Sequence, residues 1–193
     1  MNRIFYMVSG FLACLMMTGC SNYAIPRYTS SADNLAVLRK IESPAVALGA
    51  FKTSDSDIKD NVMCRAAGPV KTPDGETFAD YIRKAIAAEL TVAGKYDERS
   101  PVVITGTLTT IQFNSQIGEW NLGLALKSSN GQQLTVDEKY SYGFSWLADT
   151  ACTQTAQAAM GAIQDLIHKA VTDPAFPSLM RPLPNPVVYD RLH

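Results

Sequence analysis

Histidine is scarce in this chain of 193 residues, which contains only His168 and His193. No pair of Cys or His residues has metal-ligand spacing, so we expect neither a metal centre nor a bound cofactor. A single internal histidine also leaves a hydrolase without an evident nucleophile–base pair, although a lysine or carboxylate base stays open. We therefore interpret His168 as an ordinary, partly exposed helix residue and expect no enzymatic activity.

An excess of charge is also absent, since 17 Lys and Arg residues stand against 18 Asp and Glu residues. Without a basic stripe, nucleic acid is not an expected partner. Beyond the first twenty residues no segment is long and apolar enough to cross a membrane. Asp55, Asp57 and Asp60 lie close together, but they lack the ligand number and the turn glycine of a calcium loop. We interpret them as part of a solvated loop.

The first twenty residues carry the most specific pattern in the sequence. Arg3 is their only charged residue, an apolar stretch covers residues 4–17, and Thr18-Gly19-Cys20 follows. The stretch is shorter than the roughly 20 apolar residues that span a bilayer, and it has the length of a signal-peptide core. Small residues directly before a cysteine resemble the lipobox of bacterial lipoproteins, with Met17 where leucine is usual.

This resemblance implies a lipidated N-terminus. Residues 1–19 would be a signal peptide, and Cys20 would carry acyl chains (palmitate or similar) that together anchor it stably to a membrane. By the same resemblance, Ser21 in place of aspartate implies transport to the outer membrane, with the protein facing the periplasm. An ordinary cleaved signal and a short uncleaved anchor are the alternatives.

The remaining cysteines predict a disulfide. Cys14 would leave with the signal and Cys20 would be lipidated, so Cys64 and Cys152 remain. Two cysteines in an oxidising compartment favour a bridge over two separate buried thiols. A bridge that closes a loop of this length contributes about 4–5 kcal/mol in the chain-entropy model.

The mature chain divides into three parts by composition. Residues 20–40 are mostly polar, so we predict a lipidated cysteine and a tether, with one helical turn near its end. Residues 41–173 contain the periodic apolar patterns of a single domain. Residues 174–193 contain five prolines and are predicted to be an extended tail.

Apolar periodicity in the domain predicts a strand, a helix, three strands and a helix. The predicted strands are 45–51, 102–113, 120–127 and 134–146, and the predicted helices are 76–93 and 150–171. A phase shift near Thr109-Thr110 predicts a β-bulge. Asn130-Gly131 predicts a type I′ hairpin turn. Residues 52–74 are predicted to form a long polar loop.

These elements predict an α+β fold. The expected architecture is a two-layer sandwich in which a four-stranded, mainly antiparallel sheet (β-α-β-β-β-α) carries both helices on one face. If the first two strands are neighbours, helix 76–93 is a right-handed crossover between parallel strands. Cys64 and Cys152 then lie at the same end of the sheet, which makes the disulfide geometrically possible.

A second resemblance rests on this element order and on Ala93-Gly94-Lys95-Tyr96 before a Thr- and Val-rich strand. Together with the lipobox, these features resemble the small YajG-type periplasmic lipoproteins. The order is also similar to that of the lipopolysaccharide-assembly lipoprotein that plugs an outer-membrane barrel. The resemblance implies a non-enzymatic accessory lipoprotein that acts through protein–protein contacts in envelope assembly or maintenance. A lipid or lipopolysaccharide carrier is the alternative, and no site residues carry over.

The aromatic row of strand 134–146 has two interpretations. Most of it is expected to be core, because the opposite face of the strand is polar. In the alternative, its outer end, Phe144 and Trp146, is an exposed partner surface, since aromatic residues are common interface anchors. Tyr189 in the tail is a further candidate contact, and an open sheet edge is another.

Overall fold

The computed structural model describes residues 23–54 and 61–183. Cys20, Tyr189 and the three aspartates of the acidic loop lie outside the described residues, so the predictions made for them stay predictions.

The larger sheet has four strands in the order β2-β5-β6-β7. Their bounds are β2 Ala47–Thr53, β5 Val103–Asn114, β6 Glu119–Ser128 and β7 Gln133–Ser141. β2 runs parallel to β5, and the other neighbours are antiparallel. The chain passes from β2 to β5 through α3 (Phe78–Val92), so the predicted parallel crossover is present. The register of β5 on β6 shifts between Leu108 and Thr110, which confirms the predicted bulge.

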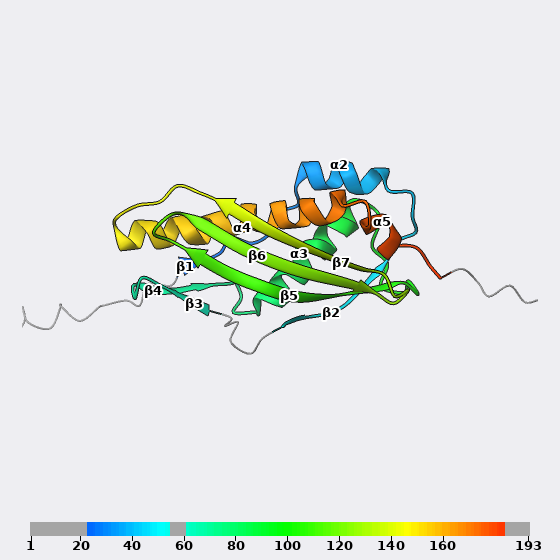
Figure 1. Cartoon of the computed structure of the whole chain (residues 1–193), viewed down its shortest axis with the longest axis horizontal. Helices are drawn as coiled ribbons and strands as arrows, with labels where there is room; N and C mark the ends of the chain where they lie inside the picture. The colour runs from blue at the N-terminus through cyan, green and yellow to red at the C-terminus, as the bar shows by residue number, and fades with distance from the viewer. Residues whose placement is uncertain (1–22, 55–60, 184–193) are drawn as a thin grey trace, which may run out of the picture.

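Two helices cover one face of this sheet. α3 and α4 (Ala148–Thr172) lie behind the strands in Figure 1. Leu122, Leu124 and Leu126 point into the layer between sheet and helices and are buried, whereas alternate residues of β7 are exposed. Trp120 is buried in the same layer, and its indole N–H donates to the carbonyl oxygen of Thr155 at 2.9 Å. The predicted α+β class is therefore confirmed.

The prediction of a single sheet is wrong. A second sheet, in the order β1-β4-β3, contains β1 (Tyr23–Ala24), β3 (Asn61–Cys64) and β4 (Gly68–Lys71). β1 is parallel to β4, and β3 is antiparallel to it. The predicted loop 52–74 therefore contains a hairpin. These strands are too short to show a clear alternation, and Pro69 lies within one of them.

The interpretation of residues 20–40 as a tether is wrong from Tyr23 onward. After β1, helix α2 (Ala32–Lys40) packs against α3 and α4. Ile25 and Leu38 are buried in the main core. The polar composition misled the prediction, because much of this polar character is used in hydrogen bonds inside the fold.

The tail prediction is also wrong at its start, since Phe176–Leu179 form a short helix, α5. Phe176, Leu179 and Met180 are buried. The Asn130 side chain holds this segment by donating to the carbonyl oxygens of Ser178 and Arg181 at 2.8 and 2.7 Å. A hairpin turn is present at Asn130-Gly131, and Gly131 has a φ of +88°. Asn130 does not have a positive φ, so the predicted type I′ geometry is wrong.

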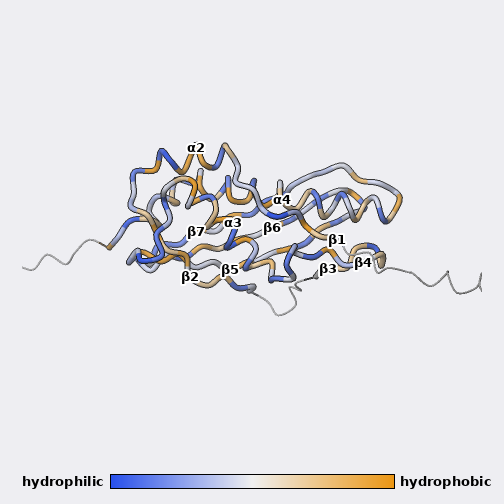
Figure 2. The backbone as a smooth tube through the Cα atoms, turned by 180° about the vertical axis from the view of Figure 1, so that it is seen from behind, coloured by the Kyte–Doolittle hydropathy of each residue, from blue (hydrophilic) through white to orange (hydrophobic). Residues whose placement is uncertain are grey.

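Hydrophobic and hydrophilic stretches are interspersed along the chain in Figure 2. Within residues 23–54 and 61–183, no helix combines the length and the hydropathy needed to cross a membrane.

Candidate interaction site

Three segments meet at one end of the domain. They are the turn between β3 and β4, the turn between β5 and β6, and residues 142–147 ahead of α4. A disulfide joins Cys64 at the end of β3 to Cys152 in α4, with the two Cα atoms 5.8 Å apart. This is the pairing predicted from cysteine number and topology, and both residues are buried.

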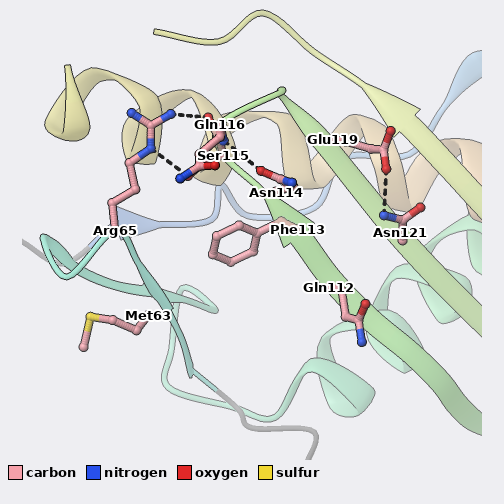
Figure 3. A pocket seen from close by; sticks show the side chains of 9 residues that line it. All are labelled: Met63, Arg65, Gln112, Phe113, Asn114, Ser115, Gln116, Glu119 and Asn121. Atoms are coloured by element: carbon pink, nitrogen blue, oxygen red, sulfur yellow. Dashed lines mark hydrogen bonds between the residues drawn. The ribbon is translucent and has the colours of Figure 1, made fainter. Parts of the chain in front are cut away.

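Arg65 ties the three segments together. Its guanidinium donates to the hydroxyl and the carbonyl oxygen of Ser115 at 3.0 and 2.5 Å, and to the carbonyl oxygens of Ser145 and Trp146 at 3.0 and 3.2 Å. Figure 3 shows the guanidinium facing Ser115. A forked, permanently charged donor suits such a multiple contact. Sequence reasoning missed Arg65, because a lone arginine in a polar segment carries no pattern.

The turn that carries Arg65 has an unusual backbone. Arg65 and Ala66 have φ angles of 46° and 55°, and Ala67 N donates to Cys64 O at 2.8 Å. Tight hairpin turns use positive φ at both central positions, which are normally Asn, Asp or Gly. A left-handed conformation costs a non-glycine residue about 1–2 kcal/mol. The disulfide and the Arg65 contacts hold the turn in place despite this cost.

Large apolar side chains are exposed around Arg65 and the three segments that it joins. Ile117 is 58% exposed, Phe144 48%, Trp146 86% and Leu147 71%, and we call these four residues the apolar end. The rings of Phe144 and Trp146 form an edge-to-face pair with centroids 5.6 Å apart. Gathered exposed apolar groups mark interaction sites more often than scattered ones do.

The aromatic row of the predicted strand 134–146 is therefore divided between the core and the surface. β7 ends at Ser141, so Phe144 and Trp146 lie beyond the sheet, whereas Tyr140 and Tyr142 pack against the core. The Tyr142 hydroxyl lies 2.7 Å from that of Thr155 in α4. The expectation that the row is core fails for its outer end, because the strand stops before reaching it.

A surface hollow of about 450 Å³ lies beside Arg65, between β3 and the end of β5 (Figure 3). Its lining is largely polar and includes Gln112, Asn114 and Asn121. The carboxylate in the lining, Glu119, is engaged by Lys139 at 2.8 Å and by the Asn121 amide at 2.9 Å. The hydrogen bond from Lys139, and then that from Asn121, lowers the pKa of Glu119. This carboxylate is therefore held in its charged form and is poorly suited to act as a general acid.

A separate polar network is buried between the N-terminal segment and the helices. Glu89 Oε1 accepts from the Tyr28 hydroxyl at 2.6 Å, from Ser31 N at 2.8 Å and from the Asn34 amide at 3.2 Å. Burial first, and then the hydrogen bond to Glu89, raises the pKa of Tyr28. His168 Nδ1 lies 2.9 Å from Asn34 Oδ1, so the imidazole contacts an amide and not a hydroxyl nucleophile. The network attaches residues 28–34 to α3 and α4.

No protein-family model matches this chain, and no curated protein matches it with statistical significance. Among the described residues, no group of three or more His, Cys, Asp or Glu side chains is placed to hold a metal ion.

Proposed function

We propose that the protein is a non-enzymatic accessory lipoprotein of the bacterial outer membrane. Acyl chains on Cys20 would anchor it with its domain in the periplasm, where it acts through protein–protein contacts in envelope assembly or maintenance. One observation carries the proposal: the lipobox-like order of Arg3, apolar run, small residues and cysteine ends three residues before Tyr23, the first residue of β1.

Two features of the domain support this proposal. The Cys64–Cys152 disulfide fits an oxidising compartment such as the periplasm. The notable polar groups are used in structural contacts: Glu89 and His168 hold the N-terminal segment, and Glu119 pairs with Lys139. A catalytic base would need a reactive partner within hydrogen-bond reach.

The packing of the core favours an accessory role over a lipid carrier. An acyl-chain groove would have to open between the helices and the large sheet. Trp120, Leu124 and Ile163 fill that layer and are at most 1% exposed. Opening a layer packed at crystal-like density would cost its dispersion and hydrophobic contacts. Extraction of the purified protein for bound lipid tests the carrier alternative directly.

The proposed lipidation is tested by intact-mass analysis of the protein from native membranes. The expected mass is that of the chain from Cys20 with acyl chains added. Cys20→Ser should lose these additions and leave the membrane fraction. An unmodified thiol at Cys20, or a leader still attached, would contradict the proposal.

The protein–protein role is tested by photo-crosslinking in intact cells. A crosslinking residue is placed in turn at Thr135 on the exposed face of β7, at Val92 at the end of α3, and at Trp146. We expect one envelope protein to form an adduct from one of these faces and not from the others. Absence of a specific adduct from all three would count against an accessory role.

A further inference from the structure

We infer that the apolar end of the domain (Ile117, Phe144, Trp146 and Leu147) rests in the headgroup layer of the bilayer that holds the acyl chains. The inference rests on the proposed lipidation of Cys20. It adds a specific orientation and a second membrane contact to that proposal.

The apolar end has the composition of a membrane-interface contact. Trp146 and Leu147 are its most exposed members, and the Phe144 ring packs edge-to-face on Trp146. Tryptophan is enriched at headgroup level, because its ring is apolar and its N–H is polar. In water these side chains leave apolar surface exposed, and burial of that surface in the headgroup layer is favourable.

The apolar end is held in place before any contact is made. Arg65 binds the turn that carries Ile117 through Ser115, and it binds the carbonyl oxygens of Ser145 and Trp146. Tyr142 N donates to Gly118 O at 2.8 Å. Gly118 has a φ of +71°, and a Cβ there would collide with the carbonyl oxygen of Tyr142. A backbone that is already ordered loses less entropy on insertion than a mobile one does.

The position of Tyr23 selects this end of the molecule. Tyr23 pairs with Val70, and its hydroxyl donates to Asp149 at 3.0 Å. Asp149 follows Leu147 by two residues, in the first turn of α4. Tyr23 is three residues from Cys20, and three residues span at most roughly 10 Å. A lipidated Cys20 therefore keeps the apolar end close to the bilayer.

The opposite end of the domain has no such link. Figure 1 shows β1, β3, β4 and the segment before α4 toward one end, and α2 and α5 toward the other. A long tether would have allowed any face of the domain to meet the membrane. Because the chain is already folded at Tyr23, only one end lies within reach.

The chemistry of the contact is apolar and not electrostatic. Arg65 is engaged by four carbonyl and hydroxyl contacts, and Asp149 holds Tyr23. We therefore expect zwitterionic phosphatidylcholine to suffice, with little dependence on salt. The anchor raises the local concentration of the apolar end at the membrane, so even weak insertion is populated.

The two tryptophans provide a direct test, because Trp120 is buried and Trp146 is exposed. Lipidated full-length protein is reconstituted in phosphatidylcholine vesicles, with and without bromine on the upper acyl carbons. Bromine on these carbons lies directly below the headgroups, so it should cause a clear loss of Trp146 emission, because an interfacial tryptophan sits close to that level. Trp146→Phe should abolish this quenching while the protein stays bound through its acyl chains.

A matched control moves the exposed tryptophan to the other end of the domain. Val92, at the end of α3, is 52% exposed. In the Trp146→Phe background, Val92→Trp should show no bromine quenching and full quenching by aqueous acrylamide. Equal bromine quenching at positions 92 and 146 would overturn the selected orientation.

The outcomes separate this inference from the proposed function. Intact mass without acyl chains would refute the lipidation itself. Acylated protein in which Trp146 is open to acrylamide and insensitive to bromine would refute the membrane contact alone. Shielding of Trp146 in native membranes but not in vesicles would assign the apolar end to a protein partner, which also overturns the inference.

Discussion

At the scale of the residue, Ala66 occupies a conformation that suits glycine better. Its φ is 55° and its side chain is exposed. Ala66→Gly removes a steric cost of about 1–2 kcal/mol and adds roughly 0.5–1 kcal/mol of unfolded-state entropy, so a net stabilisation of about 0.5–1 kcal/mol is expected. Chemical denaturation measures it. Ala67→Gly, at the next exposed position without positive φ, should destabilise instead; a matching gain in both variants would contradict the argument.

Because of Tyr81, we predict that the stability of the fold decreases at alkaline pH. Its hydroxyl donates to the carbonyl oxygen of Pro26 at 2.7 Å. Burial, with a smaller contribution from the charge of Glu76, raises the pKa of Tyr81 to about 12. The folded state therefore keeps this proton at a pH where the unfolded state has lost it. The resulting stabilisation is complete below the ordinary tyrosine pKa of about 10 and is lost as the pH rises toward 12.

This dependence is measured as the free energy of unfolding against pH. A plateau from neutral pH to about 9 should be followed by a decline, because tyrosines ionise near pH 10 when unfolded. Tyr81→Phe should lower the plateau, since the bond to Pro26 is lost. It should also make the decline shallower. An unchanged slope in Tyr81→Phe would show that Tyr81 does not contribute.

At the scale of the element, the sequence predicted the parts with strong periodicity. The strands that became β2, β5 and β6, the two long helices, the bulge and the Asn130-Gly131 turn all have local patterns, and the structure contains them. The short strands β1, β3 and β4 were missed, since two to four residues cannot show a period. Helix α2 was underestimated because Asn34 is buried only through partners distant in sequence.

Of the candidate site, too, only the part with a local sequence pattern could be predicted. Cysteine number and topology predicted the Cys64–Cys152 bridge, and an aromatic row drew attention to Phe144 and Trp146. Arg65 and Ile117 could not be found, because their roles depend on three segments meeting in space. Non-local contacts of this kind leave no periodic trace in the sequence.

The disulfide provides a prediction at this scale. It joins residues that are 88 apart in sequence, and loss of such a loop closure costs up to about 4–5 kcal/mol. The Cys64→Ala/Cys152→Ala double variant should lose stability toward that value in chemical denaturation. Hydrogen exchange in β3 and β4 should rise more than in β5 and β6, because the small sheet loses its covalent link to α4. A uniform rise across both sheets would contradict this local role.

At the scale of the whole molecule, the inferred membrane contact fixes which turns of the large sheet lie near the lipid. The β5–β6 turn, with exposed Gln116, is at the apolar end, and the β6–β7 turn, with exposed Gln132, is at the other end. The ten residues of β6 separate these turns by about 30 Å. A dye on Gln116→Cys in lipidated protein should therefore transfer energy to a membrane dye far more efficiently than one on Gln132→Cys. Equal transfer from both positions would mean that the domain lies flat or tumbles on its anchor. That result would contradict the inferred orientation.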